Sequence, residues 1–323
     1  MAVVISPRSG KVKKKGARLL FSDGRRRQVM LVEPMRPLET KNIPEGSWLA
    51  EEKKDGSLTM MYAVPGAVAY VNRRGRDKTA IYPELTDDEP KHLKVHGPTI
   101  IEGEAYALKG NTDSFERFLT RDLVQSPKRA REEERVSSAP LRYEAFDIVM
   151  KDGAWLVDKP IEERKKILEN TVEPTKELKI SRYSKSPREF TEKMSRDPSV
   201  EGVIFKRAGS PYESGKSPLW RKLKFKKAAD VVITGYDKGR GKRKSIGRLV
   251  AGVYDSSMGK VKEVARVGTG FKDKELVDIK RKLDRGEKVF AKVEYIKVGS
   301  QGRLRAPSFR GIRTDITIEE THV

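Results

Sequence analysis

The chain has 323 residues, enough for two domains with substantial cores. Its 69 Lys and Arg against 47 Asp and Glu give a formal net charge of +22, while hydrophobic residues still make up 36%. This balance excludes a disordered polyelectrolyte and indicates a folded protein with a cationic surface. The lack of Cys excludes disulfides and thiolate metal sites. No apolar run reaches the ~18 residues of a membrane span, and none resembles a secretory signal. We expect an intracellular protein that does not bind membranes.

The positive charge is concentrated at the two ends of the chain. Residues 1–30 carry nine Lys and Arg and one acid, and residues 229–323 carry 22 Lys and Arg and 13 acids. These ends are the expected footprint of a polyanion. We interpret residues 1–30 as a basic arm, with a short hairpin around residues 22–24.

Alternating apolar runs separated by Gly and Pro predict an α+β first domain over residues 1–228, built of antiparallel sheets with helices. The segment 121–140 is highly charged and predicts a mobile insertion or a helix with frayed ends. The expected strands are 28–32, 47–50, 58–64, 67–71 and 99–108, and the expected helices are 161–170 and 187–195.

The pattern changes near residues 227–230, where we place a domain boundary. Residues 229–323 contain strand-like stretches at 231–236, 245–255, 260–268 and 288–298, and a helix-like segment at 273–285. Several short strands and one helix in about 95 residues are typical of a small Greek-key barrel, so we predict an OB-fold β-barrel here.

Five segments carry the chemistry. In Lys53-Lys54-Asp55-Gly56, a Lys directly follows an apolar strand and precedes a tight turn, which suits a nucleophile. This pattern alone is common in exposed hairpins. Its weight comes from the segments that follow in order, which are Ile101–Glu104, Tyr143–Ile148, Glu201–Lys206 and Trp220–Lys224.

This ordered set resembles the covalent nucleotidyltransferases, and specifically the ATP-dependent DNA ligases in a minimal two-domain form. The resemblance runs from Val29 to Asp315, and it includes Val267–Phe271 and Arg303–Asp315, which are similar to the signatures of the ligase OB domain. The sequence contains no P-loop, which argues against a Walker-type ATPase.

The resemblance implies a role for each matching residue. Lys53 takes AMP as a phosphoramide, and Glu51 belongs to the ATP-binding set. The other implied roles are Arg73 at the nucleotide or nick phosphate, Glu104 at the ribose and metal, Phe146 stacked on adenine, Glu201 on the metal, Lys222 and Lys224 as catalytic lysines at the α-phosphate, and Arg313 and Asp315 at the pyrophosphate.

General chemistry agrees with these roles. A free Lys has a pKa of ~10.4 and is protonated at neutral pH, so a nucleophilic Lys53 needs its pKa lowered. Burial and neighbouring cations both lower it, and here Lys222, Lys224 and a bound divalent ion are the expected cations. The implied cofactors are ATP and Mg²⁺, with Mn²⁺ as an alternative.

Two positions depart from the ligase pattern. Leu58 stands where the family has an Arg, and Ile316 stands where it has a Lys. The expected function is a monomeric ligase that seals nicks in duplex DNA. The alternatives are an RNA-joining ligase, to which Ser57-Leu58 is similar, more distantly an RNA-capping nucleotidyltransferase, and, from a different class, a catalytically inactive OB-type DNA-binding protein.

Overall fold

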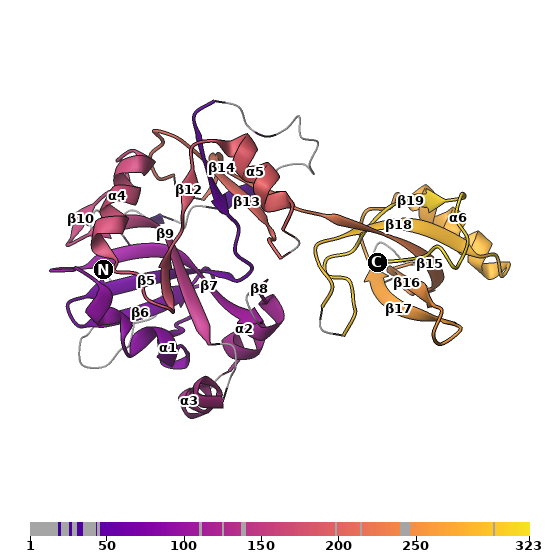
Figure 1. Ribbon diagram of the computed structural model, residues 1–323, viewed down its shortest axis with the longest axis horizontal. Coiled ribbons are helices and arrows are strands. Elements are labelled where there is room, and N and C mark those ends of the chain that lie inside the picture. Colours follow the sequence, from indigo (N-terminus) through magenta and orange to yellow (C-terminus); the bar gives the residue numbers. More distant parts are fainter. Residues whose placement is uncertain are drawn as a thin grey trace. The chain divides into compact units, whose positions relative to one another are not determined.

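In the computed structural model, the described residues are 19–20, 26–27, 31–34, 43, 46–109, 112–124, 126–136, 140–197, 199–213, 215–239, 246–299 and 301–323. The chain divides into two compact units, Met1–Lys224 and Phe225–Val323 (Figure 1). Most of the predicted basic arm and the tip of its hairpin lie outside the described residues. The short strands on either side of that tip, β1 (Leu19–Leu20) and β2 (Arg26–Arg27), pair antiparallel.

Besides the β1–β2 pair, the described part of the first unit contains two larger, mainly antiparallel sheets (Figure 1). The larger sheet has the order β10 (Ala154–Trp155), β9 (Leu141–Lys151), β7 (Thr99–Lys109), β5 (Ser57–Val64) and β6 (Ala67–Asn72), with β11 (Leu178–Ile180) on β9 and β8 (Thr112–Asp113) on β7. The smaller sheet has the order β12 (Tyr183–Ser184), β4 (Trp48–Glu52), β13 (Gly202–Arg207), β14 (Lys216–Lys224) and β3 (Leu31–Pro34).

Strand β5 shows why the two sheets pack together. Its side chains alternate between faces, and both faces are apolar. Met60 and Tyr62 join a core cluster that also contains Leu49 and Trp220 of the smaller sheet, so this cluster lies between the sheets. Met61 and Ala63 belong to a second core cluster on the other face of the larger sheet.

Helices and short helical turns complete the first unit. They are η2 (Thr79–Ile81), α1 (Pro83–Thr86), η3 (Glu89–His92), α2 (Phe115–Asp122), α3 (Pro127–Val136), α4 (Ile161–Thr171) and α5 (Pro187–Ser195). The predicted helices at 161–170 and 187–195 are confirmed as α4 and α5. The charged segment 121–140 contains the end of α2 and the helix α3. No helix in the described part of the chain is long and apolar enough to cross a membrane.

The second unit is a small β-barrel with one helix. Its sheet order is β17 (Lys260–Val267), β16 (Arg248–Asp255), β15 (Lys227–Asp237), β18 (Val289–Tyr295) and β19 (Ser308–Arg313), and α6 spans Asp273–Asp284. The Leu304 amide donates to the Val264 carbonyl at 2.7 Å, and the Phe309 amide donates to the Thr269 carbonyl at 2.9 Å. These bonds connect the two edges of the sheet and close the barrel.

The structure explains the second glycine in the segment Val267–Phe271, which we noted in the sequence. Gly270 has a φ of +95°, and a Cβ there would lie 2.3 Å from the Phe309 carbonyl oxygen. Only Gly fits this backbone position beside β19. The four strands predicted in this unit are confirmed, and β19 is a fifth strand that the alternation did not predict.

Candidate active site

The segment that contains Lys53 is held tightly by its neighbours. The Lys53 amide, just after β4, donates to the Gly202 carbonyl at 2.9 Å. A Cβ at Gly56 would lie 2.0 Å from the Ala105 carbonyl oxygen of β7, so this turn requires Gly. These two close approaches tie the turn to both sheets.

Glu201 brings two of the predicted lysines together. Its Oε2 lies 2.5 Å from Lys53 Nζ, and its Oε1 lies 2.6 Å from Lys224 Nζ. The Glu201 side chain is buried, whereas about a third of the Lys224 side chain is exposed. Lys53 and Lys224 lie 148 and 23 positions from Glu201 in the chain. They therefore share its carboxylate, directly before the start of β13.

Opposing effects act on the pKa of Lys53. Burial lowers this pKa, as expected, but the carboxylates of Glu201 and Glu104 outweigh burial. Because Glu201 contacts Lys53 directly, a pairing that the sequence did not indicate, the pKa of Lys53 lies above its ordinary value. The expected lowering includes the effect of a bound divalent ion, and it stays a prediction. Lys222 is different, because burial together with Lys224, Lys53 and Arg73 lowers its pKa.

The carboxylates present suit a Mg²⁺ ion that also binds a phosphate. Burial raises the pKa of Glu104 to about 7, although Lys53 partly opposes this shift and the Gly56 amide donates to the carboxylate. No group of three or more His, Cys, Asp and Glu in the described ranges is arranged to hold a metal by itself. Mg²⁺ usually takes only one or two protein carboxylates and completes its shell with water and phosphate oxygens. Glu104 and Glu201 fit that requirement.

In the same site, Lys206 lies against two aromatic rings. Its Nζ is 4.4 Å from the ring centroid of Phe146 and 4.2 Å from that of Trp220, and it donates to the Phe146 carbonyl at 3.1 Å. Lys206 Nζ also lies 3.0 Å from Glu51 Oε2. Burial lowers the pKa of Lys206 to about 8, and the neighbouring Glu51 opposes this shift.

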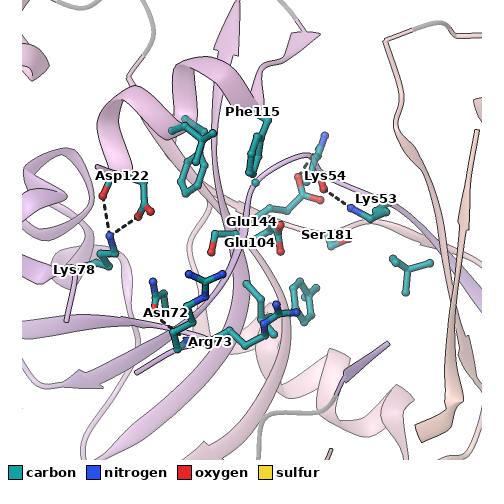
Figure 2. Close-up of a pocket in the computed structure, with 18 of the residues that line it drawn as sticks. Lys53, Lys54, Asn72, Arg73, Lys78, Glu104, Phe115, Asp122, Glu144 and Ser181 are labelled. Carbon is teal, nitrogen blue, oxygen red and sulfur yellow. Dashed lines mark hydrogen bonds and ion pairs between the residues drawn. The ribbon is translucent and has the colours of Figure 1, made fainter. Parts of the chain in front are cut away.

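Most of these residues line one cavity of about 1010 Å³, which is large enough for a nucleotide (Figure 2). Of the predicted set, the cavity brings together Glu51, Lys53, Arg73, Glu104, Phe146, Lys222 and Lys224. Glu201 is not among the lining residues, but it contacts Lys53 and Lys224, which are. Leu58, the departure from the family pattern, also lines the cavity.

Arg313 and Asp315 lie in the second unit. Arg313 Nε and Nη2 donate to the two oxygens of Asp315 at 2.7 and 2.8 Å, and Nη1 donates to Asp230 at 2.8 Å. The two predicted residues thus bind each other, and Asp230 is a third partner from β15. The sequence did not indicate Asp230.

Several charged residues of the cavity were not assigned a role from the sequence. Lys206 and Glu144 line it, and Glu144 lies 3.7 Å from Lys54. Burial raises the pKa of Glu144 to about 7. Both belong to segments selected from the sequence, where alternation along the strand could have assigned them. Lys165 of α4 does not line the cavity but is buried against Glu51. The sequence could have indicated it, because it lies four residues after Ile161 and therefore on the apolar face of the predicted helix.

Comparison with known proteins gives the family. The model of the ATP dependent DNA ligase domain matches residues 29–224. The multifunctional non-homologous end joining protein LigD of Mycolicibacterium smegmatis is 31% identical over 299 residues, which cover 84% of this chain and 37% of LigD. A solved mycobacterial DNA ligase D, complexed with ATP and MES, is 26% identical with a TM-score of 0.50, covering 92% of this chain and 98% of that one.

A solved Lig E DNA ligase, described as binding DNA with a minimal scaffold, has a TM-score of 0.61 at 19% identity and shares the fold. It covers 88% of this chain and 99% of that one. The chain therefore belongs to the ATP-dependent DNA ligase family, and its fold is a nucleotidyltransferase domain with an OB-fold domain, as predicted. It spans 37 to 40% of the length of the first curated DNA ligases that it matches.

Proposed function

We propose that the protein is an ATP-dependent ligase that seals nicks between a 5′-phosphate and a 3′-hydroxyl in duplex DNA. The observation that carries the proposal is the position of Lys53, whose Nζ shares Glu201 with Lys224 and lies beside a nucleotide-sized cavity. Family membership and the ATP bound to the related mycobacterial ligase support ATP as the nucleotide.

The chemistry proceeds in three transfers. Lys53 Nζ loses a proton and attacks the α-phosphorus, so that an N–P bond forms, a P–O bond breaks and pyrophosphate leaves. The 5′-phosphate of the nick then displaces Lys53 from that phosphorus, which links AMP to the DNA end. Finally, the 3′-hydroxyl attacks the DNA phosphate, closes the strand and releases AMP.

The residues of the cavity supply position and charge for these transfers. Lys222 and Lys224 would face the charge that develops on the α-phosphate, Phe146 would stack on the base, and Arg73 would bind nucleotide or nick phosphate. Glu104 and Glu201 would hold Mg²⁺ or Mn²⁺, which acts as a Lewis acid on phosphate oxygens when bound. Arg313 and Asp315 would orient the leaving pyrophosphate. The expected partner is nicked duplex DNA, and we expect the protein to act as a monomer.

A gel assay with a nicked duplex tests this function. We expect sealing of a 5′-phosphorylated DNA nick with ATP and Mg²⁺, and no sealing with NAD, GTP or ATP-free buffer. A parallel nick flanked by RNA strands tests the alternative that Leu58 raises. Preferred sealing of RNA would establish an RNA-joining ligase, and binding of nicked DNA without sealing would establish a binding protein.

A further inference from the structure

One buried carboxylate beside the cavity is held by two buried lysines. Glu51 of β4 is 2% exposed. Its Oε1 lies 2.5 Å from Lys165 Nζ, and its Oε2 lies 3.0 Å from Lys206 Nζ. Each oxygen of the carboxylate thus faces a different ammonium group, which leaves the side chain little freedom to turn.

One of the two lysines belongs to the cavity wall. Lys206 lines the cavity together with Glu51, Phe146 and Trp220. Because it donates to the carbonyl of Phe146 on β9 and pairs with Glu51 on β4, it joins the two sheets of the first unit. The positions of Glu51, Lys206 and the Phe146 ring are therefore coupled.

The other lysine does not line the cavity. Lys165 lies on α4, is fully buried, and has the ring of Tyr183 at 5.4 Å from its Nζ. Burying an ammonium group costs several kcal/mol unless it is paired. An apolar residue would fill this helix position at a lower free-energy cost. The contact of Lys165 with Glu51 therefore indicates that this lysine has a function.

We propose that Lys165 is a positioning residue that fixes Glu51 at the base end of the cavity and thereby sets the selectivity for the nucleotide base. This inference rests on the proposed function. A carboxylate only accepts hydrogen bonds; Glu51 Oε1 is buried against Lys165, and Oε2 keeps a lone pair beyond its contact with Lys206. A fixed acceptor favours a base with an amino group at that position over one with a carbonyl group, that is, adenine over guanine.

Equilibrium binding of ATP and GTP, without divalent ions so that no transfer occurs, tests this inference in the full chain. For Lys165→Met we expect the Kd for ATP to rise about tenfold while the Kd for GTP changes little, since one hydrogen bond to a charged group is at stake. Lys165→Arg should restore most of the preference. Lys166→Met is the matched control, because Lys166 is exposed on the same helix, and it should bind like the wild type.

A second variant separates positioning from a general effect on folding. Glu51→Gln keeps the shape of the side chain and should also lose the preference for ATP. Adding Lys165→Met to Glu51→Gln should then change the preference by less than about twofold, because the two residues act through one contact. Urea denaturation of each variant confirms that the protein measured is folded.

Three outcomes would overturn the inference: a wild type that does not prefer ATP to GTP, a folded Lys165→Met with unchanged preference, or additive effects of the two substitutions. Failure of the proposed function looks different. A wild type that binds ATP selectively but never forms an AMP adduct with Mg²⁺ would contradict the ligase activity and leave the role of Lys165 standing.

Discussion

Glu201 binds Lys53 through one carboxylate oxygen and Lys224 through the other, at 2.5 and 2.6 Å. The residue that we propose as a metal ligand therefore also positions the nucleophile and one of the α-phosphate lysines. Because Glu201 is buried, its charge is poorly shielded by water, and both contacts are strong. Glu201 thus connects metal binding to the position and protonation of Lys53.

Glu201→Gln tests this connection. The amide keeps the shape but loses the charge, so Lys53 and Lys224 lose their shared partner and the proposed metal site loses a ligand. We expect the rate of AMP transfer to Lys53 to fall by about 100-fold or more, as when one preorganised charge partner is removed from an active site. The measurement is the initial rate of adduct formation from labelled ATP. Glu192→Gln, at an exposed position of α5, should keep the wild-type rate, and an unchanged rate in Glu201→Gln would contradict the account.

Arg313 should matter for the first transfer alone. Its guanidinium is held in one orientation by Asp230 and Asp315, which suits a group that meets the pyrophosphate in a fixed geometry. For Arg313→Ala we expect adduct formation to fall by about 100-fold. Sealing of a nick that already carries AMP should stay within about threefold of the wild type, because no pyrophosphate leaves in that step.

Arg310→Ala is the control for this prediction, because Arg310 lies on the same strand and pairs with Glu294. It should leave adduct formation unchanged. An equal loss in both assays for Arg313→Ala would show that Arg313 supports the fold of the second unit and would contradict a role limited to the first transfer.

Glu89 should make the stability of the first unit depend on pH. Burial raises the pKa of Glu89 well above its ordinary value, and Tyr70 donates a hydrogen bond to it. Above pH 4.5 the folded protein therefore holds a proton that the unfolded chain has lost, so the contribution of Glu89 to stability falls as the pH rises. For Glu89→Gln, the free energy of unfolding should exceed that of the wild type more at pH 8 than at pH 4.5.

Urea denaturation at the two pH values measures this difference. Glu173→Gln, at an exposed position, is the control and should show the same pH dependence as the wild type. A difference between Glu89→Gln and the wild type that stays constant with pH would contradict the raised pKa.

The net charge of +22 should make DNA binding sensitive to salt. If six or more phosphates are contacted, affinity for a nicked duplex should fall by roughly 10³-fold or more between about 50 and 200 mM salt. Fluorescence anisotropy of a labelled duplex over a salt series gives the slope directly. A slope near zero would mean that the cationic surface is merely solvated and does not contact the DNA backbone.

The sequence predicted the fold class well because strand alternation and glycine turns are local signals. Seven of the predicted site residues line the cavity, since each of them lies in a short segment with a recognisable pattern, whereas the lining residues of α2 were not selected. The sequence could not predict that Glu201 would pair with Lys53, because that contact joins residues 148 positions apart and depends on how β4 lies against β13. The upward effect of Glu201 on the pKa of Lys53 was not predicted for the same reason.

Lys165 and Asp230 show the second limit. Neither residue lies in a segment with a recognisable chemical pattern. Each contacts a predicted site residue only because the helix or strand that carries it packs beside that site residue. A buried lysine on the apolar face of α4 was a readable signal, but its partner was not. Contacts of this kind depend on tertiary packing and not on local spacing.

The role of Lys53 as nucleophile can be read from the intact mass of the protein after incubation with ATP and Mg²⁺, with pretreatment by pyrophosphate to remove any AMP already bound. We expect the wild type to gain the mass of one AMP from ATP and none from GTP or NAD, and folded Lys53→Ala to gain nothing. No gain in the folded wild type, or an equal gain in Lys53→Ala, would contradict the assignment of Lys53 as the nucleophile.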